Sequence, residues 1–420
     1  MYHVSDSTAL LRAHRRLLSR APATPRVART VVLLGLTSLV TDISAEMVAS
    51  VLPLYLVFIG GFSPLAFGLI DGLYQGATSL VGLASGYIGD RFRRHKDVAA
   101  TGYGLSAISK ILLATAGTAL STVGAIGLID RVGKGIRTAP RDTMISLATP
   151  PEQLGSAFGV HRALDTTGAV LGPILAFAML AVAPLAFHSL FLVSFCIAIV
   201  GVALLVLFVD PQRVAPDARE RAAPSLRGAF GLLRSARYRS LLVAGGALGL
   251  ATISDAFIFL TLQEKLDLGT SLFPLLFVGS SAIYMVLAVP IGRFADRVGR
   301  GPVFIGGYAL LAVVYATVLL PGAAWPLLLG ALGMLGAYYA ATDGVLMAMG
   351  SAVVPEELRG SGLALLGTTT SVARLVASLL FGALWTLWGI HAAVASFGVG
   401  LLAAIALSAV LLGASRARRA

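Results

Sequence analysis

Two stretches of the chain repeat one pattern: Gly86-Tyr87-Ile88-Gly89-Asp90-Arg91-Phe92-Arg93-Arg94 and Gly292-Arg293-Phe294-Ala295-Asp296-Arg297-Val298-Gly299-Arg300. The first residues of the two copies, at positions 86 and 292, lie 206 residues apart, and each copy follows the second long apolar segment of its half. A motif repeated at matching places indicates a chain made of two similar halves. Polar turns between apolar segments are typical of a membrane protein built from two helical bundles, and such bundles usually transport a substrate.

The composition places most of the chain in lipid. Of the 420 residues 57% are hydrophobic and 12% are charged, and the mean hydropathy is +0.87. That leaves too little polar surface to cover a water-soluble globule. The alternation expected of a membrane β-barrel is absent, so we predict an all-α polytopic membrane protein.

A helix needs about 20 apolar residues to cross the bilayer core, and the apolar segments divide into twelve such spans. The predicted domains are a cytoplasmic arm at 1–29, an N-terminal six-helix bundle at 30–209, a cytoplasmic linker at 210–239, a C-terminal six-helix bundle at 240–414 and a cytoplasmic tail at 415–420. The predicted spans are 30–59, 65–89, 98–117, 119–148, 155–182, 188–209, 240–263, 269–293, 302–320, 325–351, 361–387 and 390–414.

The basic residues predict the orientation of these spans. The net charge is +12, and most of the 32 Lys and Arg fall in the N-terminal arm, the even-numbered loops, the linker or the tail, whereas only Lys265 falls in an odd-numbered loop. Under the positive-inside rule, both termini are then cytoplasmic. We expect a multi-pass protein of the plasma membrane, in a bacterium the inner membrane, with the lipid bilayer and no nucleic acid as partner.

The duplicated motif resembles the loop between the second and third helices of each half in the major facilitator superfamily (MFS), and the resemblance covers nearly the whole chain. In that family the Asp lies by a helix N-terminus and the Arg meets acids of the facing bundle, which stabilises the outward-facing state. The resemblance implies a gating role for Gly86, Asp90, Arg91, Arg94, Gly292, Asp296, Arg297 and Arg300. Arg93 stands where the family usually has Gly, whereas the second copy keeps Gly299.

The fourth predicted span carries an unusual number of charges. Its segment Leu128-x-x-Arg131-x-x-Lys134-Gly135 resembles a family motif whose Arg is associated with proton transfer, with Lys134 in place of the usual Gln. Asp130, Lys134, Arg137 and Arg141 are 4, 3 and 4 residues apart, so they form one stripe along a helix. Such a stripe must line an aqueous cavity or pair with acids of neighbouring helices.

The fifth span contains Gly159, Gly168, Gly172 and Pro173, which resemble a family motif found mainly in antiporting exporters, although Ala176 and Phe177 replace its terminal Gly-Gly. Glycines at this spacing let helices approach closely, and dry packing between the bundles would prevent ion leak. General tight packing is the alternative. The same span carries His161, Arg162 and Asp165, which are spaced to form a charge-paired cluster or to contact substrate.

Several acids lie within predicted spans. Asp42 and Glu46 are four residues apart on one helix face, where two carboxylates in a low-dielectric medium repel each other, so one can hold a proton near neutral pH. Alternatively, each neutralises a basic partner such as Arg131, Lys134 or Arg162. We predict proton coupling at Asp42, Glu46, Asp71 and Arg131. The predicted substrate-cavity residues are Lys134, Arg137, His161, Arg162, Asp165, Asp255, Asp343 and Arg374. We expect the last two, which belong to the second half, to pair with each other.

No phosphate-binding loop and no His pair at zinc-binding spacing occurs in the sequence, so we expect neither an enzyme nor a metal, cofactor or nucleotide site. We predict a monomeric secondary transporter that exports a small organic compound in exchange for protons. The alternatives are a carrier of an anionic metabolite, drawn to Lys134 and Arg137, and a non-transporting membrane sensor or scaffold with the same fold.

Overall fold

The computed structural model describes residues 28–74, 76, 78, 81, 94–117, 119–150, 153–210, 231–322, 325–355 and 358–417. These residues form helices α2 (Arg29–Ala49), α3 (Leu52–Leu54), a π-helical turn (Tyr55–Ile59), α5 (His95–Thr115), α6 (Leu120–Leu147), α7 (Leu154–Val182), α8 (Phe187–Phe208), a 3₁₀ turn (Leu232–Arg234), α10 (Ala236–Leu250), α11 (Asp255–Leu266), α12 (Phe273–Val298), α13 (Arg300–Leu319), α14 (Trp325–Val353) and α15 (Arg359–Ala417). A further apolar helix runs over Pro64–Tyr74.

Eight helical segments in the described part of the chain are long and apolar enough to cross a membrane. Their lengths and compositions agree with the all-α membrane protein predicted from the sequence. Helix α15 covers both of the last two predicted spans and is interrupted at Gly389, whose φ of 81° suits a residue without Cβ.

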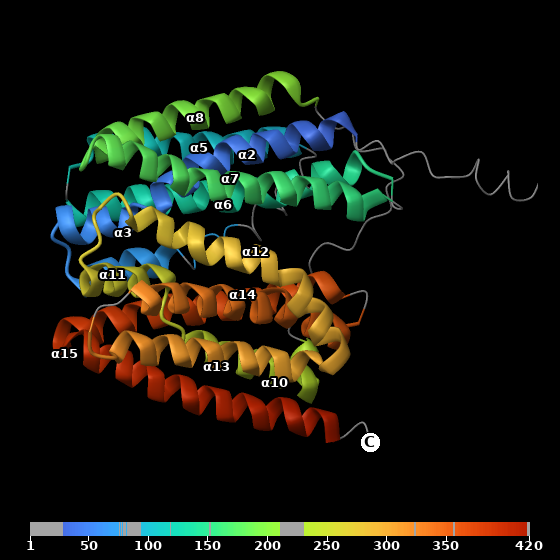
Figure 1. The fold of residues 1–420 in the computed structure, drawn as a ribbon. Coiled ribbons are helices and arrows are strands. Elements are labelled where there is room, and N and C mark those ends of the chain that lie inside the picture. Colours follow the sequence, from blue (N-terminus) through green and yellow to red (C-terminus); the bar gives the residue numbers. More distant parts are fainter. Residues whose placement is uncertain are drawn as a thin grey trace, which may run out of the picture.

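The helices lie in two bundles, with α2, α5, α6, α7 and α8 in one and α10 to α15 in the other (Figure 1). Helix α2 packs most extensively on α7 and α8, and α10 packs most extensively on α15. We name the two ends of the molecule by their elements. The junction end holds α3, α11 and Gly389, and the terminal end holds the start of α2 and the end of α15.

The two bundles share one hydrophobic core toward the junction end. From the N-terminal bundle this core takes residues of the segments 47–70, 113–126 and 176–191, and from the other bundle it takes residues between 248 and 404. At the terminal end the N-terminal bundle has a separate core, built around Val31, Leu34, Tyr103, Met144 and Leu205. Among the described residues, the buried apolar core that joins the two bundles therefore lies toward the junction end.

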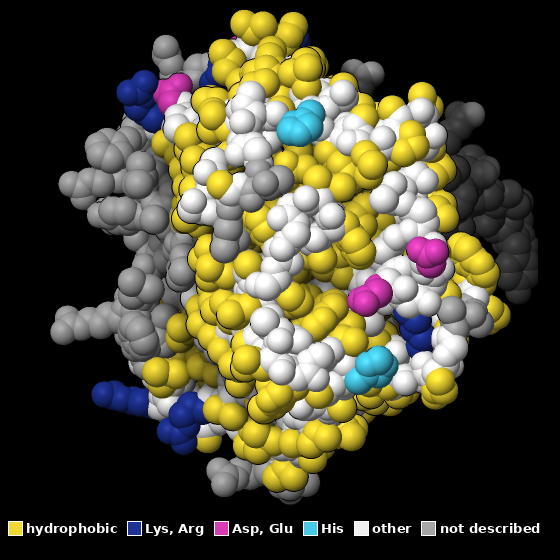
Figure 2. Space-filling view, turned by 90° about the vertical axis from the view of Figure 1, so that its left-hand side faces the viewer, with side chains coloured by type: hydrophobic (Ala, Val, Ile, Leu, Met, Phe, Trp, Pro, Cys, Tyr) yellow, Lys and Arg dark blue, Asp and Glu magenta, His cyan; other side chains and the backbone are white. Residues whose placement is uncertain are grey.

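Aromatic rings reinforce that joint. Phe67 of the N-terminal bundle packs edge-on against Phe257 of α11 at 4.8 Å between ring centroids, and Phe257 packs in the same way on Phe381. Edge-to-face pairs of this kind add about 0.5–1.5 kcal/mol beyond burial. Figure 2 looks onto the junction end, where the described surface is mostly hydrophobic and carries few Lys and Arg side chains.

Candidate functional site

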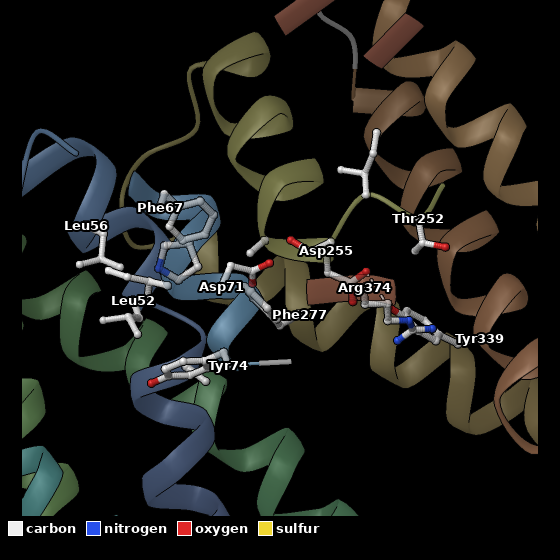
Figure 3. A pocket seen from close by; sticks show the side chains of 16 residues that line it. Leu52, Leu56, Phe67, Asp71, Tyr74, Thr252, Asp255, Phe277, Tyr339 and Arg374 are labelled. Atoms are coloured by element: carbon white, nitrogen blue, oxygen red, sulfur yellow. Dashed lines mark hydrogen bonds between the residues drawn. The ribbon is translucent and has the colours of Figure 1, made fainter. Parts of the chain in front are cut away.

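A cavity of about 280 Å³ lies between the bundles. Helices of both halves contribute side chains to it, and the close-up in Figure 3 shows its acids and its one labelled arginine. Its lining comprises Ala49, Leu52, Pro53, Leu56, Phe67, Ile70, Asp71, Tyr74, Thr252, Ile253, Ser254, Asp255, Ala256, Phe277, Tyr339 and Arg374. Its walls are largely apolar with a few polar groups, which is typical of a small-molecule site.

Asp71 and Asp255 face this cavity from opposite bundles. The Ser378 hydroxyl donates to Asp71 Oδ2 at 2.6 Å, and the Tyr339 hydroxyl donates to Asp255 Oδ1 at 2.7 Å. Asp71 and Asp255 take part in none of the ion pairs that the described residues form. Among those residues, no Lys or Arg nitrogen lies within 4 Å of either carboxylate. Their polar partners are therefore neutral hydroxyls.

Asp255 owes its position to a break in the seventh predicted span. Helix α10 ends at Leu250 and α11 starts at Asp255, so the backbone between them is not helical. The Tyr315 hydroxyl forms hydrogen bonds with two backbone groups of this segment: it accepts from Ile253 N at 2.6 Å and donates to Ala251 O at 3.1 Å. Unwound helix is tolerated in a membrane where it lines a cavity, and transporter sites are often built this way.

Arg374 lies between two cavities. It lines the one between the bundles and also a second one of about 300 Å³ inside the C-terminal bundle, where Asp343 is found. Its buried Nε has no hydrogen-bond partner. The pairing expected between Asp343 and Arg374 is wrong, because no ion pair within 4 Å joins them; Arg374 instead lies near tyrosines, with Tyr339 on one cavity and Tyr308 on the other.

The charges of the N-terminal bundle, in contrast, are paired with one another. On α6, Arg137 meets Asp42 at 2.8 Å and Lys134 meets Glu46 at 3.3 Å. The repulsion expected between Asp42 and Glu46 is thus replaced by an ion pair for each, which is the alternative that the sequence left open. A cation at this distance offsets much of the cost of burying a carboxylate.

Further ion pairs continue this row of charges along α6 in both directions. We call the paired charges of α2, α5, α6 and α7 the ladder of charges. Asp130 accepts from Arg131 at 2.8 Å and from Lys110 of α5 at 3.0 Å, with Ser106 also donating at 2.6 Å. The Arg131 guanidinium stacks on the Tyr74 ring at 4.1 Å, and that ring lines the cavity between the bundles. Sequence reasoning missed Lys110, because its partner Asp130 lies on another helix.

Toward the terminal end, the ladder of charges includes residues of α7. Arg141 pairs with Asp142 at 3.0 Å and with Asp165 at 3.6 Å, and Arg162 pairs with Asp165 at 3.3 Å. His161 does not pair with Asp165 in the described contacts; its Nε2 lies 3.0 Å from the Ser38 hydroxyl of α2. The structure therefore brings most of the predicted charged residues together, but as pairs and not as a cavity lining.

The glycines of the fifth span pack inside the N-terminal bundle. A Cβ on Gly172 would lie 2.7 Å from Ile43 O, and one on Gly168 would overlap Leu39 O, so both glycines let α7 approach α2. Gly159 has open space around it, and Pro173 lies inside the continuous helix α7. The prediction that these glycines pack between the two bundles is wrong. Gly168 and Gly172 instead bring two helices of one bundle, α7 and α2, close together.

Of the first gating motif, Gly86, Asp90 and Arg91 lie outside the described residues. Arg94 pairs with the exposed Asp97 at 2.7 Å. In the second copy, Asp296 pairs with Arg300 at 3.0 Å, and Arg300 also donates to Ala348 O of α14 at 2.9 Å.

These contacts of the second copy stay within the C-terminal bundle. Gly292 has open space around it. Arg297 forms no ion pair with the facing bundle among the residues that the structure describes.

The comparisons with known proteins agree with this architecture. The sequence profile of the Major Facilitator Superfamily matches residues 34–282 and 241–420. An uncharacterised MFS-type transporter, MJ1317, from Methanocaldococcus jannaschii is 31% identical over 372 residues, which cover 86% of this chain and 89% of the relative. The chain therefore belongs to the Major Facilitator Superfamily, a family of membrane transporters.

Solved structures show the same fold at low identity. A mutant of the nucleoside transporter NupG matches with a TM-score of 0.76 at 15% identity, over 93% of this chain and 99% of that one. A POT family transporter in complex with a thioalcohol-conjugated peptide matches with a TM-score of 0.77 at 14% identity, over 92% of this chain and 96% of that one. At such identities the likeness concerns the fold.

Proposed function

We propose that this MFS protein exports a small organic compound in exchange for protons, by alternating access of the cavity between its bundles. In this proposal twelve spans cross the plasma membrane, in a bacterium the inner membrane, both termini are cytoplasmic, and the protein acts as a monomer. The terminal end is then the cytoplasmic end, and the separate core of the N-terminal bundle there supports an inward-facing state.

The observation that carries the proposal is the contrast in partners between the acids. Asp71 and Asp255 line the cavity with hydroxyl partners, whereas Asp42 and Asp130 are held by cations. Removing one member of a buried ion pair costs about 3–5 kcal/mol, so an acid in such a pair is a poor site for a proton that must come and go. We therefore assign the exchange of proton and substrate to Asp71 and Asp255.

Charge in the cavity supports a cationic substrate. With both acids ionised and Arg374 protonated, its lining carries a formal charge of −1. One proton or one monovalent organic cation neutralises that charge, so the two compete for the same site. Competition of this kind allows antiport in an alternating-access carrier whose empty form does not reorient, because each species must leave before the other binds.

One observation favours the alternative, carriage of an anionic metabolite. Arg374 lines the cavity without a carboxylate within 4 Å among the described residues, and a guanidinium binds carboxylate or phosphate well. Lys134 is also 30% exposed, which leaves its ammonium accessible.

The test uses inside-out vesicles that contain the protein, with an imposed proton gradient and a pH-sensitive dye. Lipophilic cations such as tetraphenylphosphonium are added first and organic anions second. Proton efflux triggered by a cation, lost in Asp71→Asn and in Asp255→Asn, supports the proposal.

Asp267→Asn is the matched control, because Asp267 is an exposed acid outside the cavity and Asn tolerates its φ of 48°. A response to anions only would transfer the site to Arg374 and Lys134. Silence toward both classes would contradict proton-coupled transport of either and favour the sensor or scaffold.

A further inference from the structure

The two bundles touch through small residues at the junction end. A Cβ on Gly68 would lie 2.5 Å from Ser378 O of α15, and one on Gly72 would lie 2.8 Å from Leu375 O. On α15, a Cβ on Gly382 would overlap Pro64 O. The helix Pro64–Tyr74 and the segment 375–386 of α15 are thus in backbone contact, which glycine alone allows.

Two hydrogen bonds cross this contact. Thr386 Oγ1 accepts from Leu65 N at 3.0 Å near the surface, and the Ser378 hydroxyl donates to Asp71 Oδ2 at 2.6 Å in the interior. Ser378 is 1% exposed. Of the two bonds, only the second ends on an ionisable group, and that group also lines the cavity. One carboxylate therefore belongs to both the cavity and the closure.

A bond from a hydroxyl to a carboxylate is roughly twice as strong as the same bond to a neutral acceptor. Opening the junction end separates the helix Pro64–Tyr74 from α15, so the bond must break during alternation. Its strength depends on whether Asp71 is ionised, protonated or occupied by a cation.

We propose that the Ser378–Asp71 bond is a lock on the empty carrier: ionised Asp71 holds the junction end closed, and a proton or a cationic group at Asp71 releases it. This inference rests on the proposed function, because it assigns Asp71 as the site where proton and substrate compete. Ser378 is then a positioning residue, which acts through Asp71 and not on the substrate.

The lock explains how an antiporter can avoid leak. A carrier that returned empty would let substrate or protons move without exchange. With Asp71 ionised and bonded to Ser378, the empty carrier stays inward-facing; with Asp71 neutralised, the loaded carrier can reorient. The charged and titratable groups that face Asp71 across the cavity are Asp255 of α11, Tyr339 of α14 and Arg374 of α15, and Tyr74 lies on its own helix.

The test measures opening directly, without a known substrate. Cys196, the single cysteine, is exposed on α8 and is replaced by Ser, and Ile70, which is 3% exposed and lines the cavity, is replaced by Cys. Right-side-out vesicles are treated with a membrane-impermeant maleimide over a range of external and internal pH. Maleimide reacts with the thiolate, so labelling is expressed throughout relative to that of the same protein denatured at the same pH. This relative labelling of Ile70→Cys reports an open junction end.

In the reporter protein we expect labelling to rise about tenfold as pH falls, which is within the usual range of coupling between sites. Adding Ser378→Ala should raise labelling at high pH to the low-pH level and remove most of the pH dependence. The matched control is Thr386→Val, which deletes the other hydroxyl of the contact and should leave the pH dependence in place. Asp71→Asn should label at the low-pH level throughout.

Two results would overturn the lock: labelling of the reporter that is independent of pH, or a pH dependence that survives Ser378→Ala unchanged. The first needs no change at Ser378, so it remains decisive if that variant fails to reach the membrane. The proposed function fails separately, in the vesicle assay with cations and anions. A pH-dependent opening that needs Ser378, in a protein that answers to neither class of compound, would uphold the lock and contradict the proton-coupled export.

Discussion

The ladder of charges in the N-terminal bundle and the cavity between the bundles use the same residue types for opposite purposes. In the ladder, six cations of α5, α6 and α7 each have a carboxylate within 4 Å. In the cavity, Asp71 and Asp255 have hydroxyl partners and Arg374 has no carboxylate that close among the described residues. An intramembrane charge therefore indicates function only when its partners are known, because a paired charge can serve the fold alone.

The largest effect is expected at the cavity. Asp71→Asn and Asp255→Asn should abolish proton-driven accumulation and weaken downhill exchange of a cation, because the amide keeps the shape of the carboxyl but neither exchanges a proton nor neutralises a cation. Accumulation and counterflow in proteoliposomes measure the two activities separately. Accumulation that persists in both single variants and in the double variant would remove the distinction between cavity and ladder.

The next effect concerns the stability of the ladder. Asp42→Asn leaves Arg137, which is 2% exposed, without its ion-pair partner, and breaking such a buried pair costs about 3–5 kcal/mol. We expect a clear fall in the thermal unfolding temperature of the purified protein in detergent. The double variant Asp42→Asn with Arg137→Gln should recover part of the loss, since it leaves no charge unpaired. An unchanged unfolding temperature in the single variant would mean that the pair contributes nothing to the fold.

A smaller effect is expected from the glycines of α7, which hold the ladder's helices together. Gly172→Ala puts a Cβ 2.7 Å from Ile43 O of α2 and should destabilise the protein by about 1–3 kcal/mol, as overpacking does. Gly159→Ala enters open space and should be neutral or stabilise the helix by up to about 1 kcal/mol. Unfolding temperatures of the two variants, compared side by side, test the assignment, and equal values would contradict it.

The smallest effect is expected at the surface. Arg94 and Asp97 form an ion pair in which both side chains are largely exposed, and exposed pairs contribute about 0–1 kcal/mol. Asp97→Asn should therefore leave the unfolding temperature within the error of measurement. A fall in unfolding temperature as large as that of Asp42→Asn would contradict the view that exposed ion pairs contribute less to stability than buried ones.

Much of the fold could be predicted from the sequence, because apolar segments of about 20 residues leave few choices to a chain in lipid. The spacing of Lys134, Arg137 and Arg141 also predicted that these side chains share a helix face that lines an aqueous cavity or pairs with acids of neighbouring helices, and the structure has the acids. Periodicity along one helix is a local property, so it is readable from a single segment.

The partners of the cavity residues could not be predicted, because they come from distant parts of the chain. Ser378 lies 307 residues after Asp71, and nothing in a run of small and apolar residues distinguishes that serine from others. The break before Asp255 was also missed, since Ala251-Thr252-Ile253-Ser254 continues an apolar span in composition. Its signal is Ser254-Asp255, a pair typical of a helix start.

The most direct test of the central claim compares two double variants in the vesicle assay, using the first cation that triggers proton efflux. Asp71→Asn with Asp255→Asn removes the cavity acids, and Glu46→Gln with Lys134→Gln removes a partly exposed pair of the ladder. We predict no proton efflux from the first variant and efflux within about threefold of the original protein from the second, which corresponds to less than about 1 kcal/mol. Efflux that survives loss of the cavity acids and disappears with the ladder pair would contradict the account.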